Sequence, residues 1–328
     1  MRKTLQILVV AGLWCSLGCG GPGGSGQVTM RTKTIELGPL HLDRIYHSME
    51  GPSQRTRFDM SDVELLTGFS TRVVDITTGE KMGDEFFCHS QLQLDNNTRL
   101  LVNATGIDEI RFPDGFGMPI QQILKGVPES GREVSLLGMV LNNHEENIDR
   151  LTKLEVTLEY LTADDWQKSP GMKKLFKVGI PVMVQQEGST GMHHDMGDVQ
   201  MVEDLPAHWV VPPGRQVQQK KYSEVLPVDA TVHYIAVHMH NYGASMRLTD
   251  LTENKVLWQT NVVNESNRVQ IEEIPVYRSV TGFPMYRDHE YEVEAVYDNS
   301  SDRPVDAMAV MYIFYHPVGD EDITYPQS

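Results

Sequence analysis

LEVTLEYL, residues 154–161, alternates apolar and polar side chains with a period of two. Neighbouring side chains of a β-strand point to opposite faces of its sheet, so this alternation predicts a strand with one buried face. Residues 72–76 and 86–94 are further candidate strands, and turn signals such as Thr78-Gly79-Glu80 separate such runs. Short strands broken by Gly, Pro, Asn and Asp along the whole chain predict an all-β protein.

The composition is that of an ordinary globular protein, with 328 residues, 40% hydrophobic content and a net charge of −17. This length is sufficient for two domains. The acidity argues against a nucleic-acid partner, because such partners require basic patches. The sequence contains no Gly-x-Ser-x-Gly, His-Glu-x-x-His, Cys-x-x-Cys or phosphate-binding loop, which argues against the enzyme classes that depend on those motifs.

The N-terminus has the pattern of an export signal. A basic start at Arg2 and Lys3 precedes an apolar run over residues 5–17, which is short for a membrane span. Residues 1–19 resemble a bacterial lipoprotein signal with Cys19 as the lipidated residue, and residues 20–30 form a Gly-rich tether. We expect an exported, membrane-anchored lipoprotein that lies in the periplasm or at the outer membrane. Plain secretion is the alternative.

A second stretch, HYIAVHMH at residues 233–240, carries the most informative side chains. As a strand it places His238 and His240 on one face and His233 on the other. A later candidate strand, residues 306–315, has Met308 near its start. Two imidazoles and a thioether suit copper, particularly Cu(I), better than zinc or magnesium. The alternative is a polar strand face without metal.

Several segments of the second half are similar to the copper type II, ascorbate-dependent monooxygenases, the family of peptidylglycine α-hydroxylating monooxygenase and dopamine β-monooxygenase. The similar segments are WVVPPG at 209–214, VHMHNYG at 237–243, DAM at 306–308 and MYIFY at 311–315. In the first half, residues 106–119, 141–143 and 158–160 resemble the family less closely. The resemblance implies two tandem jelly-roll-like β-sandwich domains, at residues 31–174 and 175–328. It also implies that His238, His240 and Met308 bind the copper at which oxygen reacts.

The first domain departs from the family pattern at its own copper site. The adjacent histidine pair of the family falls on Cys88 and His89, and the third histidine falls on Val140, with His144 close by. Cys88, His89 and His144 are therefore a possible degraded copper site. The alternative is that Cys88 is a small buried residue and that the two histidines have no metal.

An apparent insertion between Gln185 and Ala207 holds a third candidate. Its Met192, His193, His194 and Met196 combine thioether and imidazole groups, as in a copper-binding loop. A solvated polar loop without metal is the alternative.

Three functions remain open from the sequence. The first is an exported copper monooxygenase that hydroxylates a C–H bond of a small-molecule or peptide substrate with dioxygen, using ascorbate or another external reductant. The second is a copper-binding envelope lipoprotein, without enzymatic activity, that captures or delivers the metal. The third is a structural scaffold of two sandwiches that serves adhesion or envelope interactions.

Overall fold

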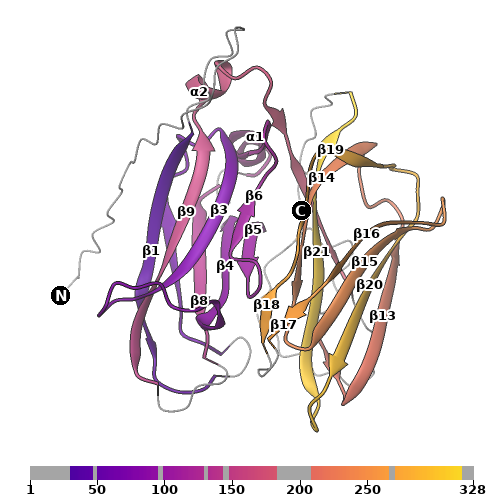
Figure 1. Cartoon of the computed structure of the whole chain (residues 1–328). Coiled ribbons are helices and arrows are strands. Elements are labelled where there is room, and N and C mark those ends of the chain that lie inside the picture. Colours follow the sequence, from indigo (N-terminus) through magenta and orange to yellow (C-terminus); the bar gives the residue numbers. More distant parts are fainter. Residues whose placement is uncertain are drawn as a thin grey trace, which may run out of the picture.

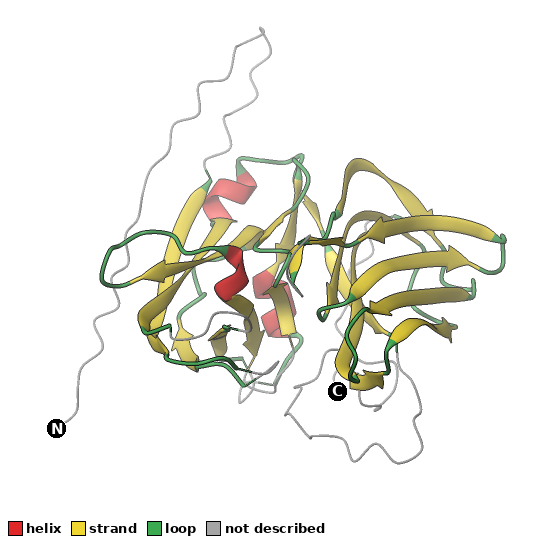
Figure 2. Cartoon of the chain, turned by 60° about the horizontal axis from the view of Figure 1, so that its bottom comes forward, coloured by secondary structure: helices red, strands yellow, loops and turns green. Residues whose placement is uncertain are grey.

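The computed structural model describes residues 30–46, 50–94, 99–128, 132–142, 148–182, 208–265 and 270–319. Its strands form two β-sandwiches that lie side by side (Figure 1). The predicted all-β fold with two jelly-roll-like domains is therefore confirmed. Figure 2 shows that the short helices belong to the first domain, so the second domain is built from strands and loops in the part that is described.

The first domain contains ten described strands and three short helical turns. The strands are β1 (Arg31–Leu42), β2 (Ser53–Phe58), β3 (Leu65–Asp75), β4 (Phe87–Leu94), β5 (Arg99–Ala104), β6 (Glu109–Arg111), β7 (Phe116–Pro119), β8 (Val134–Val140), β9 (Arg150–Leu161) and β10 (Lys173–Lys174). The helical turns are η1 (Asp84–Phe86), α1 (Ile120–Lys125) and α2 (Ala163–Gln167). One sheet has the order β1-β9-β3-β7-β10 with β6 paired to β3, and the other has the order β2-β8-β4-β5.

Strand β9 shows why the alternating sequence folds in this way. Its Leu154, Val156 and Leu158 are fully buried between the sheets. On its outer face Glu159 forms an ion pair with Arg111 at 2.7 Å. The segment after β9 forms α2, with the Thr162 side chain accepting a hydrogen bond from the backbone of Asp165. The predicted strands at 72–76, 86–94 and 154–161 thus correspond to β3, β4 and β9.

The second domain contains eleven described strands. They are β11 (Phe176–Pro181), β12 (His208–Val211), β13 (Gly214–Tyr222), β14 (Ala230–Met239), β15 (Gly243–Asp250), β16 (Lys255–Asn261), β17 (Val263–Asn264), β18 (Ile271–Glu273), β19 (Tyr277–Met285), β20 (Tyr291–Asn299) and β21 (Val305–Pro317). One sheet has the order β11-β21-β14-β19 with β12 paired to β21, and the other has the order β13-β20-β15-β16. Sheet membership changes between Lys174 and Phe176, where the predicted domain boundary lies.

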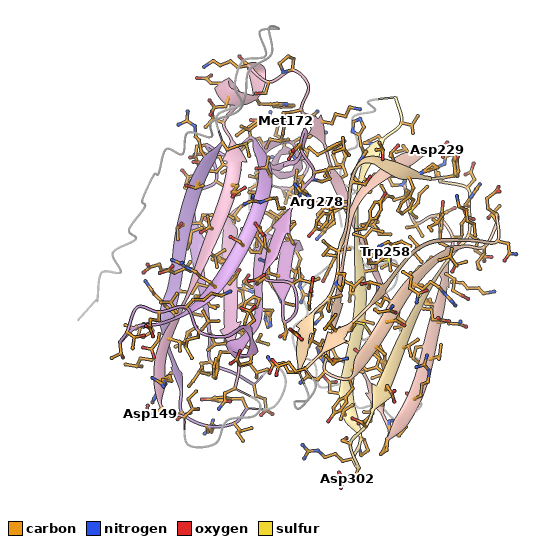
Figure 3. All side chains as sticks on the ribbon, viewed as in Figure 1. Asp149, Met172, Asp229, Trp258, Arg278 and Asp302 are labelled. Atoms are coloured by element: carbon orange, nitrogen blue, oxygen red, sulfur yellow. The ribbon has the colours of Figure 1, made fainter. Side chains whose placement is uncertain are left out.

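The β14–β21 sheet faces the first domain. The ring of Phe112, from the loop between β6 and β7, lies 5.6 Å from the ring of Tyr234 and 5.0 Å from that of Phe314. Arg278 of β19, labelled between the two domains in Figure 3, donates a hydrogen bond to the Phe112 carbonyl at 2.9 Å. The two domains therefore share an apolar interface, and the even-numbered residues of β21, together with those of β14 from Tyr234 onward, project to that side.

His233 does not lie on the face that the sequence predicts. The pairing of β14 with β21 shifts between Val232 and Tyr234, which makes His233 the extra residue of a β-bulge. Its ring stacks 4.0 Å from Phe116 of the first domain, on the same side as Tyr234. The expectation that His233 and His238 point to opposite faces is therefore wrong, because the bulge interrupts the alternation.

Candidate metal centre

Pairing along β21 brings the predicted ligands onto one face of the sheet. In β14, His238 lies opposite Val310, and in β12, His208 lies opposite Met308. Directly opposite residues of an antiparallel pair project to the same face, with Cβ atoms about 5 Å apart. Met308 and Val310 share that face because they are two residues apart. His208, His238 and Met308 thus project to the same side, which is the side toward the first domain.

His240 follows the end of β14 and lies at the middle of the cluster. Its ring centroid is 5.2 Å from that of His238 and 5.1 Å from that of His208. Its side chain is 7% exposed. Three imidazoles from two separate segments therefore meet at one end of the sheet.

Asp306 adds a carboxylate to the same cluster. Its Oδ1 lies 3.2 Å from His208 Nδ1, and its Oδ2 lies 2.8 Å from His240 Nδ1. Donor atoms of His208, His240 and Asp306 all lie within 4.8 Å of one another, the arrangement expected where side chains can hold a metal ion. Metal bonds of about 2 Å place the donor atoms that bind one ion roughly 3 to 4 Å apart. Side-chain rotations that move these atoms by about 1 Å would therefore bring them to metal-binding distances.

Several nitrogens of the cluster are buried without a hydrogen-bond partner among the described residues. They are Nε2 of His208, Nδ1 of His238 and Nδ1 of His240, whose contact with Asp306 is close but not aligned as a hydrogen bond. Buried polar atoms of folded proteins nearly always have a partner, so three such nitrogens in one cluster need an explanation. A metal ion bound to them would supply it.

The electrostatics of the cluster favour ligands ready to bind a cation. Burial, and then the neighbouring His240, His89 and His208, lower the pKa of His238 well below its ordinary value. Burial would raise the pKa of Asp306, but its contacts with the rings of His208 and His240 outweigh burial and hold that pKa well below the usual range. A neutral imidazole and an ionised carboxylate are the protonation states that metals bind.

A hydroxyl from the facing sheet fixes the backbone of two of these residues. The Tyr297 hydroxyl, on β20, accepts a hydrogen bond from the His240 N–H at 3.0 Å and donates one to the Met308 carbonyl at 2.5 Å. Tyr297 is fully buried and its ring packs against Trp209, whose ring centroid lies 5.3 Å away. The end of β14 and the start of β21 are therefore held together by one side chain.

In the first domain the structure places Cys88 and His89 side by side. Cys88 is the extra residue of a bulge in the pairing of β4 with β8, and its Sγ lies 3.2 Å from Nδ1 of His89. Burial, followed by the charges of Arg99 and His240, lowers the pKa of His89 to about 3. Val140 is a fully buried core residue. His144 lies outside the described residues, so the degraded site remains a prediction.

The candidate loop site is not part of the described structure. Met192, His193, His194 and Met196 fall within residues 183–207, and Cys19 falls within residues 1–29, all outside the described ranges. These assignments also remain predictions.

The sequence did not identify His208 and Asp306 as members of the cluster. Asp306 is two residues before Met308, so the period of a strand already places both on one face. His208 directly precedes the WVVPPG segment, but Asp306, whose carboxylate it contacts, is 98 residues away in sequence. Only the pairing of β12 with β21 reveals its place.

Comparison with known proteins yields fold likeness alone. No family model matches the chain, and no curated protein sequence matches it. Among solved structures, the amidase PNGase F is 10% identical with a TM-score of 0.42, covering 89% of this chain and 97% of the other. The capsid protein VP54 of the virus PBCV-1 is 9% identical with a TM-score of 0.39, covering 94% of this chain and 99% of the other. These likenesses are too loose to bear on function, and the resemblance to the copper monooxygenases remains a prediction from the motifs.

No helix in the described ranges has the length and apolar character needed to cross a membrane.

Proposed function

We propose that this protein binds a single copper ion at the end of the β14–β21 sheet and uses it as a monooxygenase-type oxidoreductase. The observation that carries the proposal is the meeting of His208, His238 and His240 with three buried nitrogens that have no hydrogen-bond partner among the described residues. Met308, 3% exposed and opposite His208 in the pairing, adds a thioether on the same face. Imidazole with thioether is a ligand combination that suits copper.

The residues of the centre have separate tasks in this proposal. His238 and His240 hold the metal as neutral imidazoles, and the thioether of Met308 favours the reduced ion. The carboxylate of Asp306 accepts a hydrogen bond from the His208 ring and lies 2.8 Å from Nδ1 of His240, so it fixes ring orientation, as carboxylates commonly do beside metal-bound histidines. Bound copper would supply one-electron redox chemistry with dioxygen.

The proposed reaction is the hydroxylation of an aliphatic or benzylic C–H bond, with ascorbate or another external donor as reductant. The carboxylate of Asp306 is the most exposed part of the cluster, because its side chain is 44% exposed, compared with 21% for His208 and 7% for His240. In this proposal a small substrate and dioxygen approach the centre from the Asp306 side.

Ascorbate-driven consumption of dioxygen by the copper-loaded protein tests this function. Wild-type protein should consume dioxygen and transfer an atom from isotopically labelled dioxygen into one member of a panel of C–H substrates. His240→Ala should do neither. His289→Ala is the matched control, because His289 also contacts a carboxylate, that of Asp250 at 2.7 Å, but lies outside the cluster.

Copper capture without catalysis is the second candidate. It is favoured by Val140, a buried core residue at the position where the family's electron-storing copper would have its third histidine. Protein that binds one copper ion through His240 and consumes no dioxygen with ascorbate would establish this second candidate and exclude the first.

We also propose an exported location, with Cys19 carrying a lipid anchor. The support is the sequence pattern of residues 1–26. In bacterial cells Cys19→Ala should move the protein from the membrane fraction to the soluble fraction. Unchanged membrane attachment would contradict the lipoprotein assignment.

A further inference from the structure

The centre offers two different sets of three ligands that share His240. The set implied by the sequence is His238, His240 and Met308, which ends in a soft thioether. The set assembled by the structure is His208, His240 and Asp306, whose donor atoms lie within 4.8 Å of one another. The second set ends in a hard carboxylate oxygen.

Both sets lie on the same face and are offset along the same strand. Asp306 and Met308 are two residues apart in β21, which corresponds to about 7 Å along the strand. His240 reaches the Asp306 end, with Nδ1 at 2.8 Å from Oδ2. It also reaches His238, at a ring-centroid distance of 5.2 Å. An ion held by His240 would therefore have the strand position of Met308 on one side and the donor atoms of His208 and Asp306 on the other.

Ligand hardness determines which oxidation state each set prefers. Thioether sulfur selects Cu(I), whereas carboxylate oxygen and imidazole suit divalent ions. Two imidazoles with one carboxylate also match the ligands of zinc and of other divalent ions. Asp306 lies 3.2 Å from His208 and 2.8 Å from His240, so its carboxylate is placed where the second positive charge of a divalent ion has to be balanced.

We propose that His208, His240 and Asp306 form a distinct site for a divalent ion, Cu(II) or Zn(II), and that reduction moves copper to His238, His240 and Met308. This inference rests on the proposed copper centre. One electron from an external reductant such as ascorbate converts Cu(II) to Cu(I), and no covalent bond of the protein forms or breaks. His208 and Asp306 release the ion, while His238 and Met308 take it up.

Metal affinities of two variants test the proposal, with Zn(II), Cu(II) and Cu(I) as the probes and competition against chelators of known affinity as the measurement. Asp306→Asn removes the carboxylate and should weaken the affinities for Zn(II) and Cu(II) by about 10- to 100-fold, while the affinity for Cu(I) should change by less than about threefold. Met308→Leu keeps the side-chain volume and should weaken the affinity for Cu(I) alone. The Cu(II) electron paramagnetic resonance spectrum should match wild type in Met308→Leu and differ in Asp306→Asn.

Matched controls separate these effects from damage to the fold. Asp250→Asn removes another carboxylate that contacts a histidine, and Met311→Leu alters a fully buried methionine on the opposite face of β21. Neither should change any of the three affinities. Equal weakening of Cu(I) and Cu(II) by Asp306→Asn would overturn the second set, and so would no weakening at all.

His240→Ala distinguishes this inference from the proposed function. Loss of all three metals in His240→Ala, together with uniform effects of Asp306→Asn, would overturn the second set and leave the copper centre intact. Undiminished binding of all three metals by His240→Ala would overturn the copper centre itself.

Discussion

Replacement of Tyr297 by phenylalanine probes the support of the metal centre without removing a ligand. The lost hydroxyl accepts from the His240 N–H at 3.0 Å and donates to the Met308 carbonyl at 2.5 Å. Both groups would be left in a buried environment, at a cost of about 1 to 3 kcal/mol for each one that finds no substitute. We therefore expect the apo protein to lose about 2 to 4 kcal/mol of unfolding free energy, measured by urea denaturation.

Tyr291→Phe is a closely matched control on the same strand. Tyr291 is also fully buried, and its hydroxyl accepts from the Tyr286 N–H at 2.6 Å and donates to the Tyr286 carbonyl at 3.0 Å. This variant removes the same atom and a comparable set of backbone hydrogen bonds, at a position six residues before Tyr297, which is about 20 Å along the strand. This variant should lose stability but retain wild-type copper affinity.

The effect on copper separates the two variants. Without the hydroxyl, the end of β14 and the start of β21 are no longer tied together, so binding must order both segments. A loss of about 1.4 to 2.8 kcal/mol of binding free energy corresponds to a 10- to 100-fold weaker copper affinity. Chelator competition measures it, and the smaller stabilisation of Tyr297→Phe by copper gives a second readout. Copper affinity equal to that of Tyr291→Phe would refute the reasoning.

Three further predictions concern the rest of the molecule. Burial, and then the charge of Arg99, lowers the pKa of Lys177 from the usual 10.5 to about 7. Between pH 7 and pH 10.5 the unfolded chain therefore binds one proton more than the folded chain, so the free energy of unfolding, measured with urea, should rise with pH over this range. Lys177→Met should flatten that rise. Phe112→Ala should cost about 3 to 5 kcal/mol, because the ring fills the space against Phe314 and Tyr234; a loss below about 1 kcal/mol would contradict the packed interface. Cys88→Ser should leave the copper content unchanged if the first domain no longer binds copper. A lower copper content in Cys88→Ser than in wild type would show that the first domain still has a copper site.

The fold followed from the sequence wherever the local pattern was regular. The alternation of residues 154–161 predicts β9 because one face of that strand is buried and the other is solvated. The same period placed His238 and His240 together. It failed at His233, because that residue is the extra residue of a β-bulge that no local pattern signals.

The membership of the centre depended on long-range pairing. His208 entered only through the pairing of β12 with β21, which joins segments about a hundred residues apart in the chain. Asp306 had the correct period for the shared face, but a carboxylate two residues from a methionine is not by itself a metal signal. The sequence could thus predict the strands that carry the centre, but not the complete set of side chains that meet there.

Copper content of protein purified with copper, compared between wild type and His240→Ala, tests the central claim most directly. The account predicts that His240→Ala holds one copper ion per chain fewer than wild type, while the control His289→Ala holds the wild-type amount. Equal copper in wild type and His240→Ala would contradict a metal centre at the end of the β14–β21 sheet.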